Sequence, residues 1–160
     1  FVLGLYFLSS RLRPLIIQVS SFTVAHTLTL ALSMLGLVSI PSAIIEPLIA
    51  LSIVFVAVEN WFTERLQPWR PFLIFGFGLI HGFGFAGVLK EINLGPADFA
   101  TSLVFFNVGV ELGQLAVIAI AYGALGFWVD QKDWYRARIV RPLTILIGAT
   151  GFVWFLERIL

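Results

Sequence analysis

The chain of 160 residues is 59% hydrophobic and only 12% charged, and its mean hydropathy is +0.99. Because a soluble domain carries about 25% charged residues, this composition excludes an ordinary soluble protein. The net charge of +1 gives no reason to expect nucleic-acid binding, and the absence of Cys excludes disulfides, thiolate metal ligands and a cysteine nucleophile.

Long apolar stretches in the chain predict membrane-spanning helices. A helix that crosses a hydrocarbon layer of about 30 Å needs about 20 residues. Five such stretches lie at roughly 15–38, 42–62, 70–90, 99–128 and 138–159. Residues 1–9 are too few to span, and we expect them to end a helix that begins upstream. The sequence therefore predicts an all-α polytopic transmembrane helix bundle of about six spans, the first truncated. We expect one domain over residues 1–160, which forms the C-terminal part of a longer protein.

Turn-forming residues separate these stretches. Arg11, Arg13 and Pro14 break the first pair of helices. Ser39 to Ser42, with Pro41, predict a tight turn between the second and third helices. No linker or low-complexity segment indicates a second domain.

The distribution of Lys and Arg predicts the orientation, because positive residues near span ends are retained on the cytoplasmic side. Eight of them lie in alternate loops on one side, namely Arg11, Arg13, Arg65, Arg70, Lys132, Arg136, Arg138 and Arg141, against Lys90 and Arg158 on the other. We therefore expect the loops near residues 10–14, 63–70 and 130–141 to be cytoplasmic and the C-terminus to be outside.

Three ionisable residues fall near the middle of separate predicted spans. His26 lies about halfway along the second helix, His81 about halfway along the fourth, and Glu111 near the middle of the fifth. A charged side chain at mid-membrane costs at least about 2.5–3.5 kcal/mol, so such groups usually face one another, water or an ion. Taken singly, each His also suits an ordinary interhelical hydrogen bond. The common depth of the three favours a buried ion or proton site.

Further polar residues lie close to this level. Asn107 and Gln114 lie four residues before and three after Glu111, which predicts a polar stripe on one face of the fifth helix. Thr23 and Thr27 place hydroxyls within one turn of the first imidazole. Imidazole and carboxylate ligands suit nickel, cobalt, zinc or iron ions. A ligating His must be neutral, so metal binding should weaken as the pH falls.

Glu59 and Glu46 are additional candidates at the two ends of the third span. Glu59 is near the cytoplasmic end, where its side chain either reaches out to the interface, which is the plainer interpretation, or guards an inner mouth. Glu46 is near the outer end. There a carboxylate either caps the helix N-terminus or admits ions, and both interpretations stay open.

The fourth helix is unusually rich in glycine. The segment FGFGLIHGFGFAG contains Gly76, Gly78, Gly82, Gly84 and Gly87. This density predicts either close packing of a neighbouring helix on the Gly78 and Gly82 face or local unwinding around an ion. The spacing from Gly82 to Gly87 also matches GxGxxG, but that motif requires a preceding strand, so we expect no organic cofactor.

Four segments of the chain resemble the HupE/UreJ family of bacterial membrane proteins, namely FTVAHTLTL, EPLIALSIVFVAVEN, GLIHGFGFA and FNVGVELGQ. The family accompanies hydrogenase and urease systems, and its members are regarded as nickel or cobalt permeases. The resemblance implies a divalent transition metal ion as substrate, in the bacterial cytoplasmic (inner) membrane. His26, His81, Glu111, Asn107, Glu59 and Glu46 all fall in the matched segments. The family's His and Asp/His motif of the first transmembrane helix would lie upstream of Phe1.

Our leading hypothesis is a metal permease that is not an enzyme and binds nickel or cobalt, or alternatively zinc, iron or copper, at the midplane. Its expected partners are the lipid bilayer and the metal ion, and a homo-oligomer or a partner membrane subunit stays open. A second hypothesis is an accessory or scaffold subunit of a membrane complex, in which the same polar groups form interhelical hydrogen bonds. A third is an intramembrane metal-binding protein or metalloenzyme, which would require further ligands and a substrate cleft.

Overall fold

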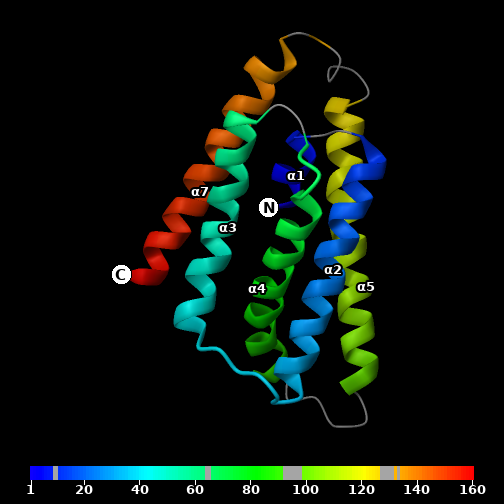
Figure 1. Cartoon of the computed structure of the whole chain (residues 1–160), viewed down its shortest axis with the longest axis vertical. Coiled ribbons are helices and arrows are strands. Elements are labelled where there is room, and N and C mark those ends of the chain that lie inside the picture. Colours follow the sequence, from blue (N-terminus) through cyan, green and yellow to red (C-terminus); the bar gives the residue numbers. More distant parts are fainter. Residues whose placement is uncertain (9–10, 64–65, 92–98, 127–131, 133) are drawn as a thin grey trace.

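The described part of the chain is helical throughout, apart from short connections. The computed structural model describes residues 1–8, 11–63, 66–91, 99–126, 132 and 134–160. The elements are α1 Val2–Leu8, α2 Leu12–Met34, α3 Ser42–Phe62, α4 Arg70–Glu91, α5 Phe99–Ala121, the π-helical segments η1 Tyr122–Gly126 and η2 Arg136–Val140, and α7 Arg141–Ile159. They run side by side as an elongated bundle (Figure 1), which confirms the predicted all-α fold.

Several of these helices meet the requirements of a membrane span. Within the described residues, four stretches are long and apolar enough, namely Leu12–Met34, Ser42–Phe62, Ala100–Gly126 and Arg136–Ile159. The helix α4 has 22 residues, of which Arg70–Ala86 form a shorter apolar stretch. Together with the seven residues of α1 they correspond to the predicted spans and the short first segment, with ends that differ by a few residues.

The two ends of α2 differ from the prediction for reasons of backbone chemistry. The predicted break between the first two helices is confirmed, because α1 ends at Leu8 and α2 begins at Leu12, three residues earlier than predicted. Pro14 is the third residue of α2, where its missing N–H would have no helical acceptor. At the other end α2 stops at Met34, before the predicted turn. Gly36 adopts a φ of 73°, and the Leu37 N–H donates to the Leu32 carbonyl at 3.0 Å, which is the usual glycine-terminated helix end.

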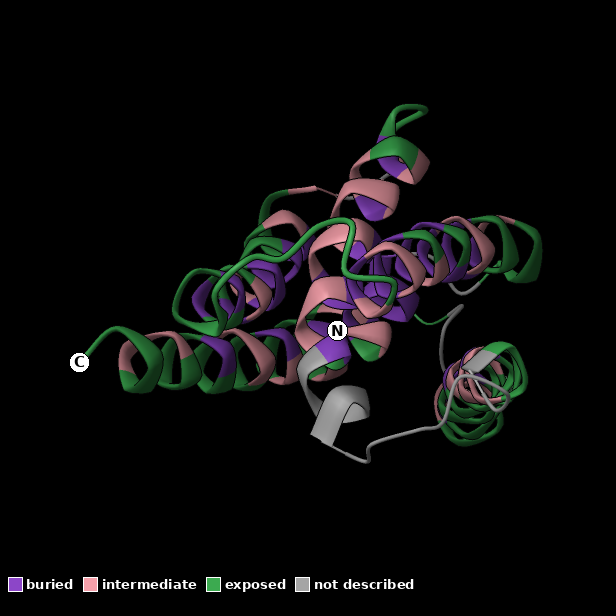
Figure 2. Cartoon of the chain, turned by 90° about the horizontal axis from the view of Figure 1, so that it is seen from below, coloured by how far each residue is buried: buried purple, intermediate pink, exposed green. Residues whose placement is uncertain are grey.

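The interior of the bundle is centred on α1. Its residues from Gly4 to Leu8 are all buried, and the chain begins near the middle of the bundle (Figure 2). Leu5 and Tyr6 belong to one apolar cluster with residues of α2, α3 and α4, including Val19, Val56 and Ile74. This short helix therefore packs among the longer ones in the interior of the bundle.

The edges of the bundle are formed by α5 and α7 (Figure 1). The helix α7 packs along α3, whereas α5 packs on α2 and α1. Only 17% of the most apolar window of α5 and η1 is buried, compared with 50% in α2. The outward residues Val104, Phe105 and Leu112 are exposed, as a bilayer-facing helix requires.

The glycines of α4 allow close contact with α2. A Cβ on Gly78 would lie 2.5 Å from the Phe22 carbonyl oxygen, and a Cβ on Gly82 would overlap the His26 carbonyl and the Thr29 hydroxyl. The predicted close-packing face is therefore confirmed. The alternative of local unwinding is wrong, because α4 is a continuous helix from Arg70 to Glu91.

Candidate functional site

His26 lies in the interior of the bundle, between α2 and α5. Its side chain is fully buried, and its Nδ1 atom lies 3.2 Å from Oδ1 of Asn107 on α5. Asn107 is itself buried. The structure thus brings together two of the predicted site residues, which are 81 positions apart along the chain.

The hydrogen bonds of Asn107 determine which nitrogen of His26 carries the proton. The amide nitrogen of Asn107 donates to the Leu103 carbonyl at 2.8 Å, so the amide oxygen is the atom turned toward α2. This oxygen also lies 2.7 Å from the Thr27 hydroxyl, whose one proton is shared between Asn107 and the Thr23 carbonyl, likewise 2.7 Å away. A pure acceptor beside Nδ1 requires Nδ1 to be the protonated nitrogen. Nε2 of His26 then holds a lone pair, and it is buried with no hydrogen-bond partner among the described residues.

A second hydrogen bond joins the same two helices one turn of α2 earlier. The Thr23 hydroxyl donates to Oε1 of Gln114 at 3.3 Å, and both side chains are buried. Asn107 and Gln114 lie seven residues apart, so they share one face of α5. The predicted polar stripe therefore faces α2 at these two positions.

His81 lies on α4 and is oriented by α3. Its Nε2 atom lies 2.9 Å from the Ser52 hydroxyl oxygen, and both residues are buried. The Ser52 hydroxyl donates its own proton to the Ile49 carbonyl at 2.6 Å, so it accepts from His81. Nε2 is therefore the protonated nitrogen of His81, and Nδ1 holds the lone pair.

The two imidazoles share an apolar surrounding. The Phe22 ring stacks on His26 with centroids 5.9 Å apart and meets His81 edge-on at 5.1 Å. Phe85 and Phe106 also contact the His26 ring, at 5.4 and 6.1 Å. Such rings exclude water from the imidazoles and lower the local dielectric, which strengthens any interaction between a ring nitrogen and a cation.

Glu111 lies on α5, one turn beyond Asn107, and is half-buried. Within the residues described, no hydrogen bond or ion pair engages its carboxylate. Its position is consistent with helical geometry, because residue 111 lies between Asn107 and Gln114 in height but at the flank of their common face. The structure therefore does not place Glu111 in a hydrogen-bonded cluster with His26 or His81.

Glu59 does not reach out to the interface, which corrects the plainer interpretation of this residue. Its Oε2 atom lies 3.2 Å from Nε of Arg70, and the side chains of Arg70 and Glu59 are only 1% and 7% exposed. The side-chain amide of the next residue, Asn60, donates to the Gly4 carbonyl at 2.7 Å. The backbone carbonyl of Asn60 accepts a hydrogen bond from Arg136 at 2.9 Å. This polar cluster connects α3 to α1, α4 and η2.

Glu46 does not cap α3, so the capping interpretation is also wrong. The helix begins at Ser42, its first turn contains no acidic residue, and Glu46 lies in the second turn. Its carboxylate instead lies 3.3 Å from Nε of Arg158 near the end of α7, with both side chains partly exposed. This pair connects the far ends of α3 and α7.

The predicted metal ligands do not form one complete cage in the described part of the chain. No group of three or more His, Cys, Asp or Glu residues is close enough there to hold an ion. The two imidazoles both contact Phe22, and a half-buried carboxylate lies on α5. Sites with few protein ligands leave the remaining coordination positions of a metal ion to water.

Sequence reasoning missed Ser52 and the role of Arg70. Ser52 is a hydroxyl near the middle of an apolar span, so the argument from common depth could have found it if it had included neutral polar groups. Arg70 was assigned to a cytoplasmic loop, but its side chain is fully buried and paired with Glu59. Only the packing of α3 against α4 reveals that partner.

Comparison with known proteins supports the resemblance seen in the sequence. The family model described as HupE / UreJ protein matches residues 1–158. No curated protein and no solved structure matches the chain. Because the matched region covers nearly all of this helical membrane protein, the chain belongs to the HupE/UreJ protein family.

Proposed function

We propose that this protein is a permease for a divalent transition metal ion, with nickel or cobalt as the favoured substrate. The observation that carries the proposal is that each of the two buried imidazoles is hydrogen-bonded to an oxygen of a neighbouring helix. Each ring donates its proton to a neutral oxygen of another helix, Asn107 for His26 and Ser52 for His81, and keeps a lone pair on its other nitrogen. Metal-ligating His residues are characteristically oriented in this way.

The chemistry of these groups suits a first-row transition metal. Imidazole nitrogen binds nickel, cobalt, zinc, copper and iron, whereas magnesium and calcium prefer sites made only of oxygen. The family resemblance favours nickel or cobalt among these ions. In our proposal Nε2 of His26 and Nδ1 of His81 are ligands, Glu111 supplies a carboxylate, and Asn107 positions His26. A site with so few ligands binds an ion transiently, as transport requires. No catalytic step is part of this proposal.

Glu59 and Glu46 have a structural role in this proposal. Each is paired with an arginine, and such a carboxylate is a weaker ligand because its charge is already compensated. We therefore propose that both hold the ends of α3 in place and that neither binds the transported ion.

We further propose that the protein lies in the bacterial inner membrane with its arginine-rich end in the cytoplasm and its C-terminus outside. The excess of Lys and Arg in alternate connections supports this orientation. In Figure 1 the connection between α2 and α3 lies at one end of the bundle, opposite the end where α3 stops and α4 begins.

Metal uptake into proteoliposomes tests the permease. We expect uptake of nickel or cobalt by the parent chain, at least tenfold slower uptake by His81→Ala and Glu111→Gln, and unchanged uptake by Gln114→Leu. Gln114 lies on the same helix as Glu111 but bonds to Thr23 and to neither imidazole. Equal uptake by the parent, His81→Ala and Glu111→Gln would refute the site.

A scaffold subunit is the second candidate, and the hydrogen bond between Thr23 and Gln114 favours it. That bond joins α2 to α5 without involving a titratable group, as a purely structural contact would. A scaffold predicts no bound metal in the purified protein and a stable complex with another membrane subunit. Stoichiometric metal that is lost in His26→Ala and His81→Ala would exclude it.

A further inference from the structure

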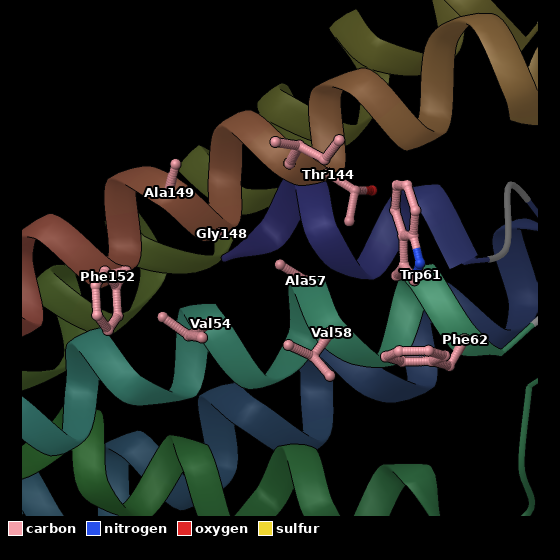
Figure 3. A pocket seen from close by; sticks show the side chains of 10 residues that line it. Val54, Ala57, Val58, Trp61, Phe62, Thr144, Gly148, Ala149 and Phe152 are labelled. Carbon is pink, nitrogen blue, oxygen red and sulfur yellow. The ribbon is translucent and has the colours of Figure 1, made fainter.

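An apolar groove runs along the outer surface between α3 and α7 (Figure 3). Its volume is about 390 Å³, within the range of roughly 300–1,000 Å³ that is typical of ligand pockets. Small residues form its floor, because Ala57 is buried and a Cβ on Gly148 would lie 3.1 Å from the Ala57 Cβ. Val58 and Phe152 form its rims and are 50% and 51% exposed.

The end of this groove near the start of α7 is positively charged. The guanidinium carbon of Arg141 lies 5.7 Å from the centroid of the Trp61 ring, which lines the groove. Both residues are exposed, and within the described residues no carboxylate pairs with Arg141. The nearest carboxylate along α3, Glu59, is buried against Arg70 and does not pair with Arg141.

Two features place this charged end at the level of lipid headgroups. Tryptophan is enriched at the boundary between hydrocarbon and water, and Trp61 lies in the last turn of α3. The adjacent Phe62 is 78% exposed, as a side chain in contact with lipid would be. The groove therefore descends from the interface into the hydrocarbon region.

The groove also contains a polar group without a partner. The Thr144 hydroxyl is buried and, in the part of the chain that the structure describes, forms no hydrogen bond. Figure 3 shows Thr144 on the α7 wall, at the end of the groove where Trp61 lies. An acceptor oxygen placed just below the headgroup would satisfy it, and the ester carbonyls of a phospholipid lie at that depth.

We propose that this groove binds an anionic phospholipid from the leaflet that surrounds the arginine-rich end of the bundle. One acyl chain lies on the floor formed by Ala57 and Gly148, and the phosphate contacts Arg141 beside Trp61. The apolar floor matches the acyl chain, and the guanidinium of Arg141, which pairs with no carboxylate among the described residues, matches the phosphate. Basic residues at the end of a cleft between membrane helices commonly bind anionic lipid in this way. The inference does not depend on metal transport.

Native mass spectrometry of the full chain, released from nanodiscs of phosphatidylglycerol and phosphatidylcholine, tests the proposal. We expect the parent to retain phosphatidylglycerol preferentially. Arg141→Gln should lower this preference about fivefold, the effect of one arginine near an anionic surface. Arg158→Gln is the control, because Arg158 also lies over a tryptophan on α7, 6.0 Å from the Trp154 centroid, but it is paired with Glu46 and lies outside the groove.

Filling the groove gives an independent arm. Ala149 lines the groove and is exposed, so Ala149→Phe should fold normally and retain at least fivefold less of both lipids. Val58→Trp fills the same space from the α3 side if the first variant folds poorly. Equal retention by the parent and both filled variants would overturn the proposal. The proposal would also be overturned if Arg141→Gln and Arg158→Gln lowered the preference for phosphatidylglycerol equally. It would likewise be overturned if the filled variants changed only the number of protein chains that associate and left lipid retention unchanged.

Discussion

At the scale of single residues, each buried imidazole is fixed by one neutral oxygen. Asn107 accepts the proton of His26 Nδ1, and Ser52 accepts that of His81 Nε2. A neutral acceptor orients the ring and stabilises its charged form less than a carboxylate would. The rings therefore offer lone pairs from opposite nitrogens, one Nε2 and one Nδ1.

The role of Asn107 leads to a first prediction. Asn107→Leu removes the acceptor of His26 and of Thr27 while it keeps the side-chain volume. Loss of such an orienting partner typically lowers metal affinity about 10- to 100-fold, and we expect that loss here. Isothermal titration of the purified protein with nickel or cobalt measures it. Gln114→Leu serves as the control and should bind as the parent does; equal loss in both variants would mean that α5 packing, not the tautomer of His26, is at stake.

The residues of the site could be predicted from the sequence only in part. His26, His81 and Asn107 were found because polar groups at mid-membrane depth are conspicuous among apolar neighbours. Ser52 was not found, because a single hydroxyl can satisfy itself within its own helix, as its bond to Ile49 shows. For Glu59 the depth could be predicted but not the partner, since burial of Arg70 depends on which helices become neighbours.

At the scale of helices, the contact between α2 and α4 depends on glycine. A methyl group on Gly82 would meet the carbonyl of His26, so any larger residue there must push the helices apart. Because the backbone of His26 forms this contact, a larger residue at position 82 that separates the two helices also displaces the His26 imidazole. Packing and site geometry are thus coupled through one position.

A second prediction follows for this contact. Gly82→Ala should destabilise the fold by about 1–3 kcal/mol, the usual cost of overpacking a tight contact. Gly76→Ala is the control, because nothing lies within 4 Å of the added Cβ and alanine is the better helix former by about 1 kcal/mol. Unfolding in mixed micelles with increasing sodium dodecyl sulfate compares the two. A Gly82→Ala protein as stable as Gly76→Ala would contradict the close approach of α4 to α2.

The two ion pairs of α3 differ in what they contribute. Glu59 and Arg70 are buried together at one end, so removal of either charge leaves the other uncompensated in a dry environment. Glu46 and Arg158 are partly exposed at the other end. The Glu59–Arg70 pair therefore contributes more to the stability of the fold than the Glu46–Arg158 pair does, although both join α3 to a neighbouring helix.

Neutralisation of each carboxylate is the third prediction. Glu59→Gln should cost about 3–5 kcal/mol, because it isolates a buried guanidinium. Glu46→Gln should cost about 0–1 kcal/mol, as for other exposed pairs. The yield of monodisperse protein after heating, followed by size-exclusion chromatography, distinguishes them. Two variants of equal stability would show that Arg70 finds another partner or is hydrated.

At the scale of the whole molecule, the fold was largely predictable because the bilayer allows few solutions. Long apolar stretches must be helices, and this fixed five of the elements to within a few residues. The arrangement of the helices could not be derived in the same way. That α2 lies beside α4 and α7 beside α3 depends on details such as Gly78 and Gly151, whose missing side chains admit a neighbour.

The orientation of the molecule provides the fourth prediction. The chain has no native Cys, so single cysteines can be introduced without any background. Ser39→Cys and Gln67→Cys are exposed positions in connections at opposite ends of the bundle. A membrane-impermeant maleimide added to intact cells should label Ser39→Cys and leave Gln67→Cys unlabelled until the cells are opened. The reverse pattern would invert the proposed topology.

The exposed position of α5 has a mechanical consequence for the imidazole that it holds. This helix contributes the amide that fixes His26, yet little of its surface is covered by the rest of the described chain. A tilt of α5 away from α2 carries that amide with it and breaks the bonds to both His26 and Thr27 at once. The ring is then able to rotate or to move its proton to the other nitrogen, which withdraws the lone pair. If His26 is a metal ligand, as we propose, displacement of this one helix would turn the nitrogen that binds the metal into a hydrogen-bond donor without any motion of α2 itself.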